Sequence, residues 1–321
     1  MSNRNLQDLV TIIVPYYKKI NFIDDCINSI LSQTFQNFEI ILIYDDNELD
    51  ELNYIKDLAN KDSRINLIIN KKKLGAGLSR NIGIEFGKGS LIAFLDADDL
   101  WKKNHLEELF QLRKAYPHCG LYAMGYTKKY DNSNPINAHY FGLKNHSGIV
   151  PDFFMASTAD CVAWTSAVMV PKDVFKTIGY FNQGLKSGQD TEMWIRIAIE
   201  YKVAFCSNPT ACKVQRSHED HLSISKYKIE RLKIFKQFKE EEIKNLSLKR
   251  YLDLNRFSMA IDRKKSGDFK NYKLLKKSIS IKNLNAKQRL LLGLPKAVLI
   301  GLTKIQRFLL KRNIYLTVFR D

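Results

Sequence analysis

A cluster of carboxylates closes an apolar run in residues 91–101, which read LIAFLDADDLW. Residues 91–95 have the composition of a buried strand, and Asp96, Asp98 and Asp99 follow directly. Carboxylates at this spacing repel one another unless water or a shared cation compensates their charge. Mg²⁺ and Mn²⁺ prefer oxygen ligands and commonly keep substrate phosphates in their shell. The cluster therefore indicates a metal-dependent enzyme that handles a diphosphate, or else the acidic start of a helix with Asp99 as its N-cap.

Short β-rich runs alternate with helix-like segments through the first half of the chain. The expected strands cover residues 9–14, 38–44, 65–69, 90–95 and 120–125, and the expected helices cover 22–31, 50–59, 78–86 and 103–115. This alternation predicts an α/β fold in which helices flank both faces of a mostly parallel, twisted sheet. Ligands of such sheets bind beyond the C-terminal ends of the strands. We therefore expect residues 15–17, 45–46 and 96–99 to open onto one crevice.

The second half of the chain divides into an irregular part and a helical part. Residues 127–160 show little periodicity, and a strand is expected at 162–170 with helices at 172–177 and 188–200. From residue 226 the pattern is helical, with a helix hairpin of 247–265 and 268–279 in which Asp268 is the expected N-cap. We predict a catalytic domain over 1–225, with a nucleotide-binding half at about 9–126 and an acceptor half at about 127–225. A basic helical C-terminal extension over 226–321 is expected to follow.

The positive charge of the chain is concentrated in its last third. The formal net charge is +17, and residues 226–321 hold 26 Lys and Arg against 8 Asp and Glu, a balance of +18. Such a segment suggests an anionic surface as a partner. The five cysteines lack disulfide or metal-site spacing, no secretory signal opens the sequence, and no apolar run is long enough to span a membrane. These features favour a reducing, cytoplasmic environment.

Five segments of the chain, in this order, resemble the family 2 glycosyltransferases, which have the GT-A fold. They read LVTIIVPYY (9–17), FEIILIYDD (38–46), GLSRN (77–81), GSLIAFLDADD (89–99), and GYFN with GQDTEMWIR (179–182 and 188–196). The resemblance covers about residues 9–225. It implies an inverting glycosyltransferase of the bacterial surface-glycan type, which takes its sugar from a nucleotide-diphosphate donor.

The resemblance implies that six residues bind the nucleotide of the donor: Pro15, Tyr17, Asp45, Asp46, Arg80 and Asp96. Asp46 would accept a hydrogen bond from the uracil ring with Asp45 sharing that work, and Arg80 would bind phosphate or ribose oxygens. The alternatives are a turn-forming Asp pair and a surface ion pair of Arg80. The segment GAGLSRNIG at 75–83 fits neither a P-loop nor a dinucleotide-binding GxGxxG motif.

The resemblance also implies a cation site and a general base. Asp96 and Asp98 would hold Mn²⁺ or Mg²⁺ on the diphosphate, with His218 completing the shell, although a lone histidine is more often structural. Asp190 would deprotonate the acceptor hydroxyl from the start of a helix, the alternative being that it only caps that helix. The family pattern at this point is Glu-Asp, whereas this sequence has Gln189 before Asp190.

The end of the chain carries an apolar stripe with helical spacing, made of Val298, Leu302, Ile305 and Leu309. Basic residues occupy another face of the same expected helix. Such a helix can lie in an anionic membrane interface, or pack on the catalytic domain and leave its basic side in water. No nucleic-acid-binding module is recognisable, so a nucleic acid is not an expected partner.

Together these features predict an inverting, metal-dependent hexosyltransferase of polysaccharide, lipopolysaccharide or capsule biosynthesis. The expected donor is a UDP-sugar, and the expected acceptor is a hydroxyl of a saccharide or of a lipid-linked saccharide at the cytoplasmic face of a membrane. Two alternatives remain open, a nucleotidyltransferase and an inactive module of the same fold that binds glycan or nucleotide. A nucleotidyltransferase would need no base at Asp190.

Overall fold

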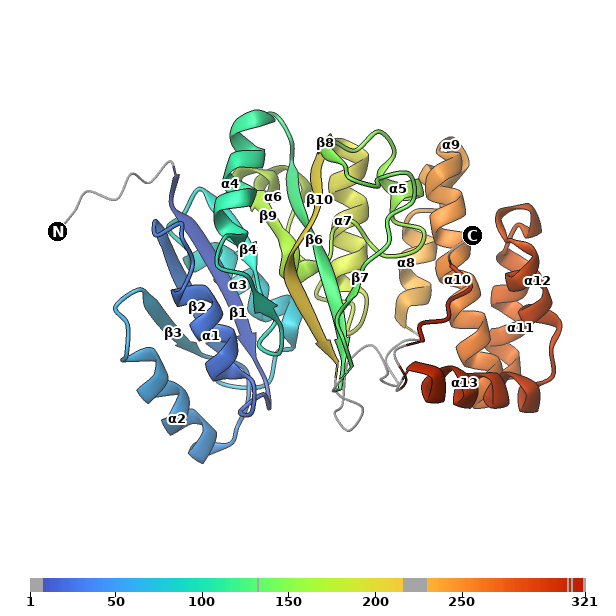
Figure 1. Ribbon diagram of the computed structural model, residues 1–321, viewed down its shortest axis with the longest axis horizontal. Helices are drawn as coiled ribbons and strands as arrows, with labels where there is room; N and C mark the ends of the chain where they lie inside the picture. The colour runs from blue at the N-terminus through green and yellow to red at the C-terminus, as the bar shows by residue number, and fades with distance from the viewer. Residues whose placement is uncertain (1–7, 132, 216–229, 311, 313, 320–321) are drawn as a thin grey trace.

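The computed structural model describes residues 8–131, 133–215, 230–310, 312 and 314–319. A sheet flanked by helices occupies the N-terminal side, and a group of helices occupies the C-terminal side (Figure 1). The strands are β1 (Val10–Tyr16), β2 (Phe38–Tyr44), β3 (Ile65–Ile69), β4 (Leu91–Phe94), β5 (Leu100–Trp101), β6 (Leu121–Tyr130), β7 (Ile136–Asn137), β8 (Ser147–Ile149), β9 (Val168–Pro171) and β10 (Val203–Gln215).

The helices accompanying the sheet are α1 (Ile23–Leu31), α2 (Leu49–Ala59), α3 (Ala76–Phe86), α4 (His105–Ala115), α5 (Phe153–Ala156), α6 (Lys172–Ile178) and α7 (Gln189–Glu200), with the 3₁₀ turn η2 (Thr165–Ala167). The C-terminal helices are α8 (Leu232–Gln237), α9 (Lys239–Lys244), α10 (Leu246–Ser266), α11 (Phe269–Ser278), α12 (Ala286–Gly293) and α13 (Lys296–Leu310), with the 3₁₀ turn η5 (Ile281–Asn283). None of the described helices combines the length and apolar character that crossing a bilayer requires.

The sheet runs in the order β3-β2-β1-β4-β9-β6-β10-β5. The ladders among β1, β2, β3 and β4 and the long ladder of β6 with β10 are parallel. The ladders of β9, β5, β7 and β8 are short and antiparallel. The predicted α/β sheet flanked by helices is therefore confirmed, as a mixed sheet whose longer ladders are parallel.

The parallel strands β1, β2 and β4 are almost completely buried and are nearly continuous apolar runs, as strands with both faces covered usually are. Gly83 lets α3 lie against β1, since a Cβ at this glycine would come within 2.6 Å of Ile13 Cγ2. The parallel direction brings the C-terminal ends of β1, β2 and β4 to the same edge. Those ends carry Tyr17, Asp46 and Asp96, so the sheet delivers three predicted site residues to one edge.

The structure corrects two local predictions and adds one strand. Residues 162–170 are only partly strand, since η2 precedes β9. The strand β10 was not anticipated, because its sequence includes Asn208-Pro209 and its pairing with β6 shifts register around that point. The N-cap interpretation of Asp99 was wrong, because β5 follows this residue and α4 begins only at His105, after Asn104.

The C-terminal helices contribute residues to the apolar core of the sheet and also form a second apolar core among themselves. Ile234, Phe238 and Leu252 belong to the large apolar cluster of the sheet, and a second cluster joins residues from α10, α11 and α12. The predicted hairpin of α10 and α11 is confirmed: the chain reverses at Gly267 (φ +87°), and Asp268 caps α11 by accepting a hydrogen bond from Asn271 N at 3.1 Å. The predicted domain boundary near residue 225 falls outside the described residues and stays a prediction.

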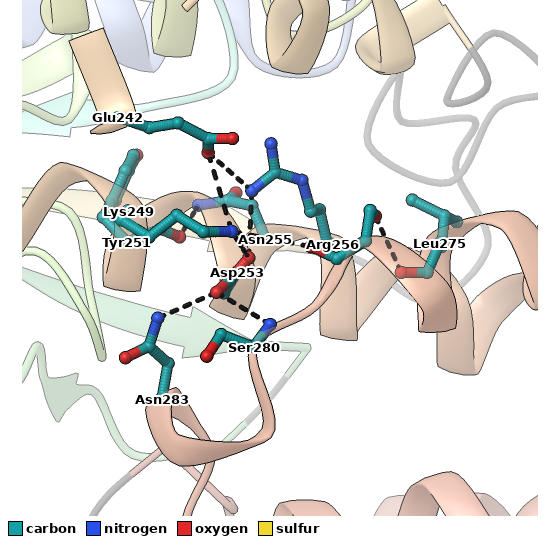
Figure 2. A network of polar contacts seen from close by, with 10 residues as sticks. Glu242, Lys249, Tyr251, Asp253, Asn255, Arg256, Leu275, Ser280 and Asn283 are labelled. Carbon is teal, nitrogen blue, oxygen red and sulfur yellow. Dashed lines mark hydrogen bonds and ion pairs between the residues drawn. The ribbon is translucent and has the colours of Figure 1, made fainter. Parts of the chain in front are cut away.

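A buried polar network stiffens α10 (Figure 2). Asp253, fully buried, accepts hydrogen bonds from Lys249 Nζ (2.7 Å) and Arg256 Nη1 (2.9 Å). It also accepts from Ser280 N (3.1 Å) and Asn283 Nδ2 (2.8 Å). A buried carboxylate is costly unless several donors satisfy it, so this network holds α10 and the segment 280–283 in one arrangement.

Candidate functional site

Two adjacent aspartates at the end of β2 have different surroundings. Asp45 accepts three hydrogen bonds, from Asn70 Nδ2 (2.8 Å), Leu74 N (2.7 Å) and Gly75 N (2.7 Å). Asp46 is 8% exposed, and its Oδ1 accepts from Asn47 N at 2.8 Å. Its Oδ2 is buried without a hydrogen-bond partner in the described structure. Asp45 thus shapes the loop before α3, whereas Asp46 keeps an acceptor atom available for a ligand.

Arg80 and Asp96 form an ion pair at the edge of the sheet. Arg80 Nη2 lies 2.5 Å from Asp96 Oδ1, and the arginine is 6% exposed while the aspartate side chain is 36% exposed. The Nε of Arg80 is buried and has no hydrogen-bond partner among the residues that the structure covers. The guanidinium therefore orients Asp96 and retains its Nε–H as a donor for a ligand. The alternative of a surface ion pair for Arg80 does not hold, because the arginine of this pair is buried.

The other two carboxylates of the cluster take separate roles. Asp98 Oδ2 lies 2.9 Å from Lys19 Nζ, a residue just beyond β1. Asp99 is buried and accepts hydrogen bonds from Ser166 Oγ (2.6 Å) and Val214 N (3.1 Å). Burial, with the neighbouring carboxylates of Asp98 and Asp96, raises the pKa of Asp99 above its usual range. Asp99 thus connects this loop to η2 and β10, and Asp96 and Asp98 remain the candidates for ligand contact.

The donor set at this edge fits a cation that a substrate helps to hold. In the described parts of the chain, no three His, Cys, Asp or Glu side chains gather as a complete metal site. Mg²⁺ typically takes one or two carboxylates from a protein and fills its shell with water and substrate phosphates, which Asp96 and Asp98 can match. The predicted third ligand, His218, lies outside the described residues.

Asp190 occupies the first turn of α7. Gly188 provides the left-handed turn before this helix (φ +82°), and Asp190 Oδ1 accepts a hydrogen bond from its neighbour Thr191 N at 2.7 Å. Asp190 is half-buried. Burial raises the pKa of the Cys161 thiol to about 12, and the charge of Asp190 adds to this shift. Burial, with the charges of Cys161 and Asp190, also raises the pKa of Tyr251.

The beginning of α3 connects these parts of the site. Asp45 binds the backbone just before this helix, and Arg80 within it holds Asp96. Gly77 faces Gln189, since a Cβ at Gly77 would lie 3.0 Å from Gln189 Cδ. The ends of β2 and β4 and the start of α7 therefore border the same helix, as a shared site requires.

Two further predicted residues lie at the end of β1. Pro15 is paired in register with Ile43 and is part of the strand. Tyr17 is 37% exposed, and Lys73 Nζ lies 3.4 Å from the centre of its ring. Tyr16 points the other way, is fully buried, and donates a hydrogen bond to Glu51 Oε2 at 2.6 Å. Of the two tyrosines, only Tyr17 can offer its ring to a ligand.

Comparisons with known proteins show the family and the fold of the chain. The sequence model described as Glycosyl transferase family 2 matches residues 11–178, slightly more than half of the chain. The chain belongs to this family. An uncharacterized glycosyltransferase of Rickettsia felis is 32% identical over 209 residues, which are 63% of this chain and 32% of the relative. The glucosyltransferase WfgD of Escherichia coli is 42% identical over 99 residues, 31% of this chain and 38% of that protein.

Solved structures show the same fold. TarS 1-349 of S. aureus, in complex with UDP-GlcNAc, superposes with a TM-score of 0.60 at 18% identity, covering 76% of this chain and 72% of that chain. The GT-A fold expected from the sequence is thereby confirmed. The chain spans only about a third of the length of the first Rickettsia relatives, 32% of each of the two proteins.

Several residues that shape the site of this family 2 glycosyltransferase had no signal in the sequence. Lys19 follows a turn, and Ser166 is one of many serines, yet Ser166 Oγ both accepts from Asp96 N (3.1 Å) and donates to Asp99. Gln189 replaces a carboxylate of the family pattern, and its amide donates to Leu185 O at 2.6 Å. Trp194, on α7, is buried and packs against Phe181.

Proposed function

We propose that this glycosyltransferase is an inverting enzyme that transfers a sugar from a UDP-sugar to a hydroxyl of a saccharide acceptor. The observation that carries the proposal is Asp46 Oδ2, a buried carboxylate oxygen with no partner among the described residues, at the sheet edge that also bears Asp96 and Asp98. The uracil ring has an N3–H group that can donate to such an oxygen. The structure of TarS with UDP-GlcNAc and the UDP-Glc in the name of WfgD support this choice of nucleotide.

The proposed reaction is a single displacement at the anomeric carbon. Asp190 accepts the proton of the acceptor hydroxyl as the acceptor oxygen bonds to that carbon. The bond from the anomeric carbon to the diphosphate breaks on the opposite face, and UDP leaves with the electron pair. Asp46 and Tyr17 would hold the uridine, while Arg80 keeps Asp96 directed at the diphosphate.

A divalent cation would supply charge neutralisation on the departing diphosphate, and Asp96 and Asp98 are the side chains proposed to hold it. Lys19 already lies 2.9 Å from Asp98, so this site pairs carboxylates with cationic side chains in the described structure. A cation at Asp98 would compete with that pair. Mn²⁺ and Mg²⁺ both suit oxygen ligands of this kind.

A test of the donor compares two nucleotides. We expect the protein to bind UDP at least about tenfold more tightly than CDP, because cytosine presents an acceptor where uracil has its N3–H group and would leave Asp46 unsatisfied. Isothermal titration calorimetry in Mn²⁺ measures both affinities. The Asp46→Asn variant should lose most of this preference, and equal affinities of the wild-type protein for UDP and CDP would contradict the proposal.

We further propose that the acceptor is part of a surface glycan or a lipid-linked saccharide, handled at an anionic membrane surface on its cytoplasmic side. The names of WfgD, a glucosyltransferase for diphosphoundecaprenol-linked GlcNAc, and of the teichuronic acid enzyme TuaG of Bacillus subtilis support such an acceptor. The support for a membrane surface is α13. This helix packs against α10 and buries Leu299, but Val298 (44%), Leu302 (42%) and Ile305 (55%) are exposed along one side.

The membrane proposal predicts an effect of charge on this stripe. The Leu302→Glu/Ile305→Glu double variant should bind vesicles of equal parts phosphatidylglycerol and phosphatidylcholine at least about tenfold more weakly than the wild-type protein. Co-sedimentation measures the bound fraction. Leu274→Glu is the matched control, because Leu274 is 60% exposed on α11 and lies outside the stripe. Equal losses in both variants would refute a specific role of α13.

A further inference from the structure

The segment 314–319, which follows α13, returns to the catalytic sheet. The ring of Tyr315 stacks on Tyr130, the last residue of β6, with 6.4 Å between the ring centres. Lys128 Nζ, from the same strand, lies 3.3 Å from the Tyr315 hydroxyl and 4.9 Å from the centre of its ring. Tyr315 therefore anchors the segment to the end of β6.

The anchor covers a buried ion pair. Lys128 is 5% exposed, and its ammonium group has three N–H donors. It contacts both carboxylate oxygens of Asp160 at 2.7 Å, and its third contact is Tyr315. Asp160 also accepts a hydrogen bond from His139 N at 2.8 Å. Because a buried ammonium is costly unless its donors are satisfied, Tyr315 completes a structure that belongs to the predicted acceptor half.

The same segment is held along the C-terminal helices. Leu316 O accepts a hydrogen bond from Gln306 Nε2 of α13 at 2.7 Å. The ring of Phe319 packs edge to face with Phe257 of α10, with 5.9 Å between the ring centres. Residues 314–319 thus form a strap that joins the C-terminal helices to the end of β6.

The strap meets the sheet at the edge that carries the candidate site. The strand β9 is antiparallel to both β4 and β6, so β4 and β6 run in the same direction and end at the same edge. Asp96 follows β4 at this edge, and Tyr130 ends β6 there. Figure 1 shows α13 along the same lower side of the molecule as the ends of β1, β6 and β10. The strap therefore connects α13 to the edge at which the donor is proposed to bind.

The strap also extends the exposed apolar surface of α13. Ile314 (47%) and Leu316 (51%), the two neighbours of the anchor, are exposed, as are Ile305 (55%) and Phe308 (53%) on α13. Exposed apolar surface of this kind marks a contact with a protein or a membrane. Charge favours the membrane, because residues 286–320 contain eight Lys and Arg and no Asp or Glu, which matches anionic headgroups.

We propose that α13 and the strap together bind an anionic bilayer and turn the edge of the candidate site toward the lipid. This orientation rests on the membrane contact in the proposed function and adds the strap to it. Tyr315 fixes the orientation, because it holds the strap on the end of β6. A lipid-linked acceptor then meets the site from the bilayer in which it is anchored.

An added tryptophan shows which parts of this surface enter the lipid. The three native tryptophans are at most 8% exposed, so lipid does not reach them. Leu316→Trp probes the strap and Ile305→Trp probes α13. Leu290→Trp is the control, because Leu290 is 64% exposed on α12, outside the proposed surface. The full-length variants are mixed with vesicles of equal parts phosphatidylglycerol and phosphatidylcholine, and quenching by brominated phosphatidylcholine is measured.

We expect the brominated lipid to quench Leu316→Trp and Ile305→Trp at least about twofold more strongly than Leu290→Trp, because only a ring in the membrane interface contacts the bromine atoms. Quenching of Ile305→Trp without quenching of Leu316→Trp overturns the orientation alone and leaves the membrane contact of α13. If all three variants are quenched equally or not at all, the membrane contact in the proposed function fails and the orientation with it.

The anchor is tested separately by the reactivity of Lys128 toward acetic anhydride, followed by mass spectrometry. Tyr315→Ala removes the ring over the ammonium group, so acetylation should be at least about tenfold faster than in the wild-type protein. Tyr315→Phe keeps the ring and should stay close to the wild-type rate. Lys88, exposed before β4 at the opposite edge, should react alike in all three proteins. Equal rates at Lys128 in all three would refute the anchor.

Discussion

The Asp190→Asn variant should bind UDP as tightly as the wild-type protein and transfer sugar about 10²- to 10⁴-fold more slowly, the range that a positioned general base contributes. The amide keeps the size of the side chain and can still accept a hydrogen bond from Thr191 N, which the carboxylate does at 2.7 Å. It has no basic oxygen to take the proton of the acceptor hydroxyl. Calorimetry with UDP and a single-turnover transfer assay measure the two effects separately.

The control for this variant is Asp173→Asn. Asp173 lies on α6 in an exposed ion pair with Lys176, its side chain 85% exposed, and it should leave both measurements unchanged. If UDP affinity and transfer fell together in Asp190→Asn, the carboxylate would serve the structure of the site. An unchanged transfer rate would remove Asp190 from the mechanism altogether.

The Asp98→Ala variant should lose more than about 100-fold of the Mn²⁺-dependent transfer rate, because charge stabilisation by a bound cation amounts to several kcal/mol. The Mn²⁺-dependent part of the UDP affinity should be lost with it. A titration of the transfer rate and of UDP binding against Mn²⁺ concentration measures both.

Lys19 offers the discriminating control, because it forms the observed ion pair with Asp98 at 2.9 Å. If Asp98 acts through the cation, Lys19→Ala keeps the Mn²⁺ dependence and Asp98→Ala loses it. If Asp98 acts only through the ion pair, the two variants lose activity alike and both retain their response to Mn²⁺. The second pattern would refute the cation role.

The elements of the sheet were predictable because their signals are local. The strands at 38–44 and 65–69 have the predicted bounds, and α1, α2 and α7 begin within one residue of the predicted positions. Burial on both faces requires continuous apolar runs, which are visible in the sequence. By contrast, β10 was missed, since Cys206 to Thr210 interrupt its apolar pattern and the strand is held by its neighbour β6.

The candidate site was likewise predictable only in part. The positions of Asp46, Asp98 and Asp190 at the ends of strands or the start of a helix follow from the order of elements, because parallel strands end at one edge of a sheet. The difference between Asp45 and Asp46 does not follow, since it depends on the amides of Leu74 and Gly75.

By itself the sequence determined the family, the α/β architecture, the carboxylates and the uneven distribution of charge, all of which reside in residue type, spacing and order. Only the tertiary structure decided which carboxylate oxygens are satisfied, which side of α13 faces outward, and that α8 and α10 border the start of α7. These contacts join residues far apart in the chain, such as Ser187 and Arg231. Their geometry depends on how whole elements pack, which no local pattern records.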